Sequence, residues 1–229
     1  MDQSMILNFF GGVSQDGFSW MIDFDKVLFE LTRWLLPIDI CLLTEGVWLE
    51  KWRKIESCSC YRYETVKIWW RQKFVKSLLN GIFVAVVFFV IAMVVDIMSA
   101  VSFPDQVWKV LVLWLAHIMT ITSFFLVLDL SNLRKLAPAI LLLLEGCTFL
   151  VGFKFVRAAR FMYGMWGMYF QSEWNFGETG ISVFTSLIAE GILLALSYLT
   201  GWVILKGRYR VSIDKKERKC LEYGGDYQH

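Results

Sequence analysis

Three ionisable side chains interrupt long apolar runs of the sequence, and they are the residues best placed for chemistry. Glu145 stands in "LLLLEGCTF", Glu190 in "SLIAEGILL" and His117 in "WLAHIMT". An ionised carboxylate near the middle of a membrane is costly, so each glutamate should face protein, water or a partner charge. Two interpretations remain open: contact with cargo or a transported proton, or a structural hydrogen bond between helices, with the following glycine allowing close approach. We expect His117 to form helix–helix hydrogen bonds rather than to act as a ligand.

A further apolar run, residues 27–49, is unusual because it also contains charged side chains. They are Glu30, Arg33, Asp39 and Glu45. The run is predicted to be a marginal span or one that packs against protein, because unpaired charges are unfavourable in lipid. Asp39 and Glu45 are expected to pair with Arg33 or with another subunit.

Four longer apolar runs reach the length of roughly 20 residues that a transmembrane helix needs. They cover about 78–100, 107–128, 136–153 and 181–205. The chain of 229 residues is 57% hydrophobic and only 19% charged, with a mean hydropathy of +0.52, which is unlike a soluble protein. The sequence therefore predicts an all-α fold. We expect one transmembrane domain over residues 1–229, a polytopic bundle of about five spans with six as the alternative. Asp96 and Asp129 stand at span ends, where we expect them to face water.

Lysine and arginine determine the orientation of membrane helices, and here they gather in three segments. The segments are residues 51–76, the turn "DLSNLRKLAP" and the tail from Lys206 to Lys219. With five spans all three fall on one side, which we expect to be cytoplasmic in a multi-pass protein of the cell membrane. The N-terminus is then outside and the C-terminus cytoplasmic. Lys154, Arg157 and Arg160 depart from this rule, and their long side chains would extend to the outer headgroups.

One basic stretch, "RYETVKIWWRQKFVKS", reads as a cytoplasmic amphipathic helix over residues 61–76, directly before an apolar run. Its apolar face follows from steps of three and four residues. The residues on that face are Tyr63, Val66, Trp70 and Phe74. Such a helix can lie on the inner membrane surface with its cations toward anionic headgroups. The alternative is that it docks a soluble partner.

The same stretch resembles the cytoplasmic segment before a long span in permease subunits of small bacterial type-2 ABC exporters. These occur in Gram-positive loci for peptide-bacteriocin export, immunity and antibiotic resistance. The residues that carry the resemblance are Arg62, Tyr63, Trp69, Trp70, Arg71 and Lys73. The loop with "EWNFG" before the last span and the basic tail after "GWVILKGRYR" fit it loosely. Permeases of this class usually have six spans and an N-terminus inside, and this chain departs from that pattern.

The resemblance implies a permease that exports a hydrophobic or peptide-like substrate, such as an antimicrobial peptide. In that family the segment is a coupling helix that lies in a groove of a soluble ABC ATPase subunit. Tryptophans suit the buried anchors of such an interface, with cations at its rim. Further partners would be a second permease copy or a paralogous permease, and membrane lipid. ATP and magnesium would bind the ATPase subunit, and no cofactor or metal is expected in this chain.

The outer loop, residues 154–180, is rich in aromatic residues, methionine and glycine. One interpretation is an interfacial helix with its aromatic belt. The other is an external lid or contact surface for a hydrophobic cargo, since methionine and aromatic side chains suit adaptable apolar binding.

Motifs of enzymes are absent from the sequence, which has no H-E-x-x-H, G-x-S-x-G, P-loop or glycine-rich dinucleotide fingerprint. The chain is therefore not expected to be an enzyme, and its net charge of +2 gives no indication of nucleic acid. Cys58 and Cys60 lack the spacing of a zinc site. Two alternatives to the permease remain: a non-transporting assembly or sensory subunit that recruits a soluble partner, and a small proton-coupled carrier or channel that uses Glu145 and Glu190.

Overall fold

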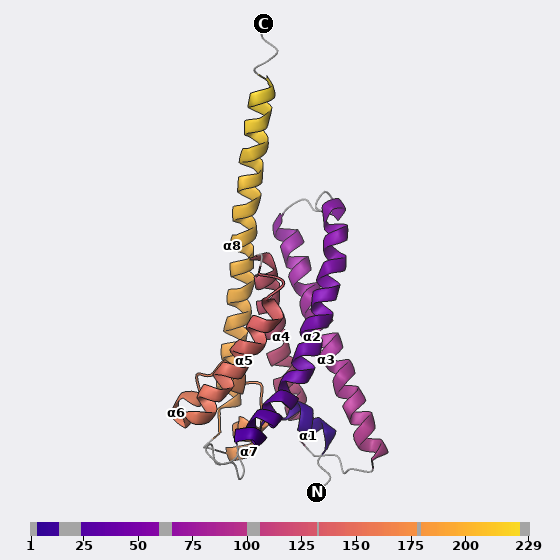
Figure 1. Ribbon diagram of the computed structural model, residues 1–229, viewed down its shortest axis with the longest axis vertical. Coiled ribbons are helices and arrows are strands. Elements are labelled where there is room, and N and C mark those ends of the chain that lie inside the picture. Colours follow the sequence, from indigo (N-terminus) through magenta and orange to yellow (C-terminus); the bar gives the residue numbers. More distant parts are fainter. Residues whose placement is uncertain are drawn as a thin grey trace.

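The described part of the protein is all-α, as the sequence predicts. The computed structural model describes residues 4–13, 24–59, 66–99, 106–131, 133–177 and 180–224 (Figure 1). Its longer helices are α2 (Phe24–Ser59), α3 (Val66–Met98), α4 (Val107–Leu130), α5 (Ala137–Lys154) and α8 (Val183–Gly224). The shorter elements are α1 (Met5–Phe10), α6 (Val156–Ala159), the 3₁₀ turns η2 (Tyr163–Met165) and η3 (Tyr169–Gln171), and α7 (Glu173–Phe176).

Four helices are long and apolar enough to cross a membrane, and they coincide with the four long runs of the sequence. They are Lys67–Met98, Val107–Leu130, Ala137–Lys154 and Val183–Gly207. In α3 and α8 the apolar side chains largely point outward, with Phe83 and Val203 each 67% exposed, as expected of surfaces that face lipid. The prediction of a membrane-spanning helical bundle is thus supported by helix length, composition and exposure.

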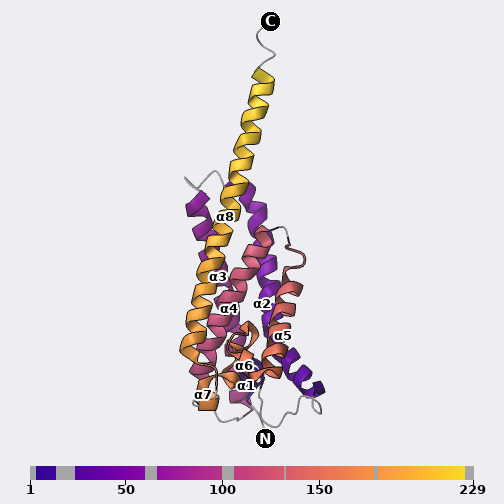
Figure 2. The ribbon, with the colours of Figure 1, turned by 90° about the vertical axis from the view of Figure 1, so that its left-hand side faces the viewer.

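Helix α4 lies at the centre of the bundle, where it packs against α1, α2, α3, α5 and α8 (Figures 1 and 2). Its apolar window is 61% buried, against 17–33% for the other three spanning helices. The C-terminal half of α8 projects beyond the bundle at the end opposite α1. A polar side chain on α4 is therefore enclosed by protein, whereas one on the outer face of α3 would meet lipid.

Helix α2 is a fifth long helix that runs without a break through Pro37. Its charges are accommodated by neighbours within the chain. Glu45 is 1% exposed and accepts hydrogen bonds from the Ser77 hydroxyl at 2.5 Å and the Asn80 amide at 2.6 Å. Arg33 pairs with Glu30 one turn earlier on the same helix, so the expected pairing of Arg33 with Glu45 is not formed. These contacts explain how a helix with this charge packs against α3.

The prediction that Asp96 and Asp129 face water was wrong for Asp96, which is buried, whereas Asp129 is half-buried and lines an open pocket. The carboxylate of Asp96 accepts hydrogen bonds from the Ser4 hydroxyl at 2.5 Å and from the backbone N–H of Met5 at 2.6 Å. It therefore supplies the acceptor that the first turn of α1 lacks. Asp129 pairs with Arg53 of α2 at 3.3 Å and its side chain is only 4% exposed.

The segment between α5 and α8 folds back into the bundle as short helical turns rather than forming one interfacial helix. Met168 is fully buried, and the Phe170 N–H donates to the Gly11 carbonyl at 2.9 Å. Gly12 has φ +85°, and a Cβ there would lie 2.5 Å from Met168, so this close contact requires glycine. The segment and α1 together cover one end of the bundle.

Candidate functional site: a buried glutamate–histidine–glutamate centre

Three helices bring His117, Glu145 and Glu190 together in the interior of the bundle. The imidazole of His117 on α4 lies between the two carboxylates: its Nε2 is 2.9 Å from Glu145 Oε1 on α5, and its Nδ1 is 3.0 Å from Glu190 Oε1 on α8. His117 and Glu145 are fully buried and Glu190 is 2% exposed. We call these three residues the ionisable centre. The expectation that His117 forms hydrogen bonds between helices is confirmed.

Two aromatic side chains complete the walls of the ionisable centre. The indole N–H of Trp34 on α2 donates a hydrogen bond to Glu145 Oε1 at 3.2 Å. The ring of Tyr163 stacks on the imidazole of His117, with ring centroids 4.7 Å apart and an interplanar angle of 28°. The centre is therefore lined by α2, α4, α5, α8 and the turn η2.

Two glycines hold residues 163–171, which we call the η2 segment, directly against the ionisable centre. A Cβ on Gly167 would lie 2.5 Å from Cγ of His117, and one on Gly164 would lie 2.4 Å from the Glu145 carbonyl oxygen. The Gly164 N–H also donates to the hydroxyl of Thr148 at 2.9 Å. By contrast, a Cβ on Gly146 or Gly191 would meet nothing within 4 Å, so the glycines that follow the two glutamates do not mediate close helix packing as the sequence suggested.

The outer oxygens of this cluster lack hydrogen-bond partners within the described residues. They are Glu145 Oε2, Glu190 Oε2 and the hydroxyl of Tyr163. Burial raises the pKa of the Tyr163 phenol well above its ordinary value, and the carboxylates of Glu145 and Glu190 add to this effect. Tyr163 therefore remains protonated and able to donate a hydrogen bond.

The geometry of the ionisable centre suits protons better than a metal ion. The two carboxylates bond to different nitrogens of one imidazole, whereas a metal ion binds a histidine through a single ring nitrogen. No metal-binding group of His, Cys, Asp and Glu occurs within the described ranges. The other predicted intramembrane residues lie elsewhere: Glu45 bonds to α3, and Asp39 is half-buried on α2.

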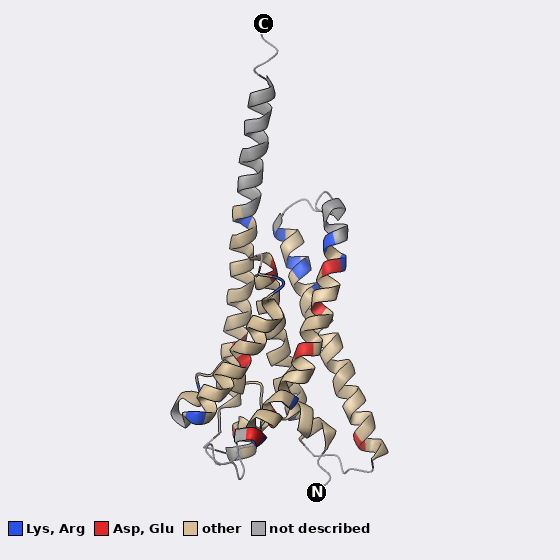
Figure 3. Cartoon of the chain, viewed as in Figure 1, with Lys and Arg blue, Asp and Glu red and all other residues tan. Residues whose placement is uncertain are grey.

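A second candidate surface lies at the end of the bundle from which α8 projects. Exposed cations from four segments gather there (Figure 3). They are Lys51 on α2, Lys67, Arg71 and Lys76 on α3, Arg134 and Lys135 in the α4–α5 turn, and Lys206 on α8. We call these seven residues the basic end. The described cations of the three basic segments predicted to share one side do lie at the same end.

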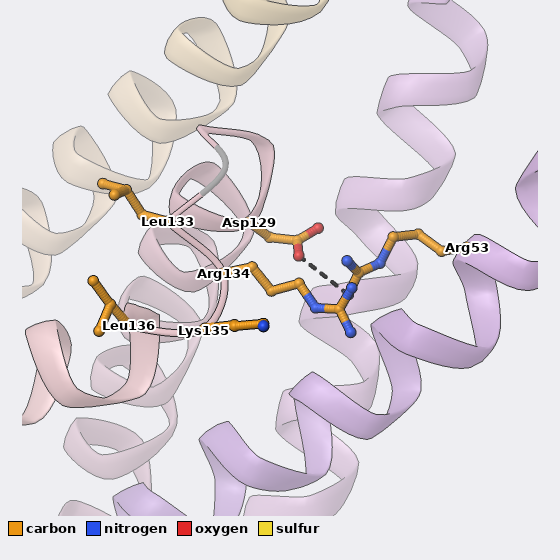
Figure 4. A pocket seen from close by; sticks show the side chains of 6 residues that line it. All are labelled: Arg53, Asp129, Leu133, Arg134, Lys135 and Leu136. Atoms are coloured by element: carbon orange, nitrogen blue, oxygen red, sulfur yellow. Dashed lines mark ion pairs between the residues drawn. The ribbon is translucent and has the colours of Figure 1, made fainter.

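An open pocket of about 530 Å³ lies at the basic end, beside the α4–α5 turn. Figure 4 shows Arg53 paired with Asp129 and the Arg134 side chain extending toward Arg53, with Leu133 and Leu136 pointing away from them. Arg134 is also 3.6 Å from Glu50, and both of these side chains are largely exposed. The pocket is thus open to solvent and has charged side chains on one wall.

The two tryptophans of the predicted coupling helix lie inside the chain. Trp70 is fully buried and Trp69 is 7% exposed, while Lys73 is 2% exposed with its ammonium 5.0 Å from the Trp69 ring centroid. Of the predicted contact residues on α3, Arg71 alone is exposed. Arg62 and Tyr63 fall outside the described residues. From Val66 onward the stretch forms the first turns of α3.

The sequence-based resemblance to exporter permeases rests on this tryptophan block, whose indoles pack against the chain's own helices. The ionisable centre has no counterpart in that resemblance. Comparison with protein-family models, with curated proteins and with solved structures finds no match for this chain.

Proposed function

We propose that the chain is the membrane-spanning permease subunit of an ABC exporter for a hydrophobic or peptide-like substrate. A separate soluble subunit hydrolyses ATP and docks on the basic end. The observation that carries this proposal is the gathering of exposed cations from α2, α3, the α4–α5 turn and α8 at one end of a bundle of membrane-spanning helices. The segments belong to different helices, so one partner seated there would contact several helices at once.

The basic end has the chemistry of a polar interface that guides a soluble partner. Two of its cations, Arg134 and Lys135, line an open pocket, and exposed charges at the rim of an interface mainly set association rate and orientation. An acidic groove on the ATPase would complement Arg71 and Lys135, which are exposed on neighbouring segments. Arg53 and Asp129 then hold the ends of α2 and α4 together beneath the contact surface.

Trp69 and Trp70 were expected to anchor the ATPase, but here their role is to hold α3 within the permease itself. They attach the start of α3 to the bundle, so a displacement at the cytoplasmic start of α3 would be carried to α8 through Trp70. The tryptophans thereby form part of a fixed packing contact between α3 and α8 within the permease. The exposed cations contact the ATPase.

The orientation follows the positive-inside rule, with the basic end in the cytoplasm and the N-terminus outside a cell membrane. A permease needs a second half to enclose a pathway, supplied by a second copy or a paralogous permease. The outward apolar faces of α3 and α8 are the surfaces available to that partner and to lipid.

The proposal is tested by purifying the tagged chain from its native membranes in mild detergent. We expect a stoichiometric ATP-hydrolysing subunit to co-elute. The double variant Arg71→Glu, Lys135→Glu should slow its association roughly tenfold and weaken the salt dependence of binding. Arg160→Glu is the matched control, because Arg160 is an exposed cation directly after α6, which lies at the opposite end of the bundle. Purification of a transport-competent chain without an ATPase would contradict the proposal.

A small proton-coupled carrier is the second candidate function, and the ionisable centre is the observation that favours it. A carrier would transport cargo in vesicles containing this chain alone, driven by a pH gradient. An exporter permease would require the ATPase and ATP in the same vesicles. Reconstitution with and without the partner therefore separates the two functions.

A further inference from the structure

The ionisable centre contains two hydrogen bonds that each need a proton. One joins His117 Nε2 to Glu145 Oε1, and the other joins His117 Nδ1 to Glu190 Oε1. With one proton in each bond, the centre is an imidazolium between two carboxylates and carries a net charge of −1. That charge would be buried in the membrane interior, since the three side chains are 0–2% exposed.

Neutralising this charge requires one positive charge in addition to the two protons of the hydrogen bonds. Within the described residues no lysine or arginine supplies it: the groups against His117 there are Glu145 from α5, Glu190 from α8, Tyr163 from η2 and Trp34 from α2. Of these only the glutamates and the tyrosine titrate, and a neutral tyrosine contributes no charge. Uncompensated buried charge is strongly disfavoured in a bilayer.

We propose that the ionisable centre is a binding site for one further proton, carried on a carboxyl oxygen that points away from His117. Glu145 Oε2 and Glu190 Oε2 are both buried and have no hydrogen-bond partner among the described residues, so either can take it. The proton enters from water and is bound as a carboxyl O–H, which leaves one neutral acid, one imidazolium and one carboxylate. The inference does not depend on either proposed function.

Hydrogen bonding favours Glu190 as the member that is protonated. Glu145 Oε1 accepts hydrogen bonds from two groups, His117 and the indole of Trp34. Among the described residues, Glu190 accepts one, from His117. More donors stabilise the ionised form of a carboxylate. Glu190 belongs to α8, so its protonation state acts directly on the contact between α8 and α4.

The enclosure of the centre selects a proton over a larger cation. The Tyr163 ring covers the face of the imidazole, and Gly167 approaches His117 so closely that even a methyl group would clash. A hydrated metal ion or an ammonium group on cargo would require the η2 segment to move. A proton does not.

Infrared difference spectroscopy tests the proposal, because the C=O stretch of a protonated carboxyl is distinct from that of a carboxylate. The full chain is measured in nanodiscs of neutral lipid at neutral pH, in light and heavy water. The wild type minus Glu190→Gln spectrum should show one protonated carboxyl per chain. The wild type minus Glu145→Gln spectrum should show the same loss, since either neutral amide leaves a balanced imidazolium–carboxylate pair. Glu173→Gln, a carboxylate outside the centre, should give no such loss.

A further variant should increase the protonated-carboxyl signal instead of removing it. In His117→Gln the bridge is neutral, so both carboxyls should be protonated and the signal should double. The proposal is overturned if only one glutamate variant removes the signal, because the proton then belongs to one residue and not to the centre. It is also overturned if wild type itself shows no protonated carboxyl. A signal that appears only in buffer without sodium and potassium would overturn it as well, because a larger cation would then compete for the site. The wild-type measurement stands even where a variant fails to fold.

Discussion

The indole N–H of Trp70 donates a 3.0 Å hydrogen bond to the backbone carbonyl of Tyr198, 128 positions later in the chain. The two rings stack with centroids 6.0 Å apart, and Phe74 meets Tyr198 edge-on at 5.2 Å. On the same face of α8, Gly201 is so close that a Cβ there would lie 2.2 Å from the Trp70 ring. The start of α3 and the middle of α8 are therefore held as one unit.

Trp70→Ala should destabilise the folded bundle strongly, because it leaves a cavity and removes the hydrogen bond and ring contacts to Tyr198. Truncation of a fully buried tryptophan costs roughly 3–5 kcal/mol. Trp108→Ala is the control, since Trp108 is 56% exposed and its truncation loses mainly a ring contact with Trp174, worth roughly 1 kcal/mol. Thermal unfolding of the purified proteins measures both. A Trp70→Ala protein as stable as wild type would mean that the indole is not packed against α8.

Gly201→Ala tests the same contact between Trp70 and α8 from the side of α8. The added methyl group overlaps the Trp70 ring, and overpacking of this kind typically costs roughly 1–3 kcal/mol. Gly191→Ala lies on the same helix with nothing within 4 Å of its Cβ, so it should be neutral or stabilising by up to ~1 kcal/mol. Equal melting temperatures for the two variants would contradict the close contact.

Gly167→Ala should lift the η2 segment from His117 without changing any ionisable group. The backbone amides of residues 163–171 should then exchange hydrogen faster than in wild type, because their packing is loosened. Gly146→Ala is the control, with open space at its Cβ. Unchanged exchange in the Gly167 variant would show that the segment does not seal the centre.

Asp96→Asn should release α1 from the bundle. The amide retains the shape of the side chain but loses the negative charge that accepts from Ser4 and Met5 at the start of the helix. We expect faster hydrogen exchange confined to residues 5–10. Asp25→Asn, an exposed carboxylate on α2, serves as the matched substitution and should leave this exchange unchanged.

Topology is tested with single cysteines in a background without the native ones. Asn175 and Lys135 are both exposed and lie at opposite ends of the bundle. A membrane-impermeant reagent added to intact cells should label a cysteine at Asn175 and not one at Lys135. The reverse pattern would place the basic end outside and remove the basis for a cytoplasmic ATPase.

The sequence predicts the spanning helices well because length and apolarity are local properties. It also places His117, Glu145 and Glu190 near the middle of their runs, so a common depth could be inferred. Their pairing could not, since it depends on helix order and rotation, which packing determines. The sequence thus identified the three ionisable residues but could not show that they contact one another.

The environment of other segments was predicted wrongly because the same amino-acid composition suits both a surface and an interior. The aromatic and methionine-rich loop suits a membrane interface and a protein interior equally, and Met168 proves to be buried. Trp69 and Trp70 likewise fit an exposed docking surface or an internal joint. Asp96 stands at the end of an apolar run, and only the long-range contact with α1 explains its burial.

The most direct test of the proposed function maps the partner on the bundle. A photo-crosslinking amino acid is placed at Arg71, at Lys135 and, as the control, at Arg160, and intact cells are irradiated before purification. We expect crosslinks from Arg71 and Lys135 to an ATP-hydrolysing subunit and none from Arg160. Crosslinks to that subunit from Arg160, or none from either position at the basic end, would contradict the assignment of the chain as a permease whose ATPase docks there.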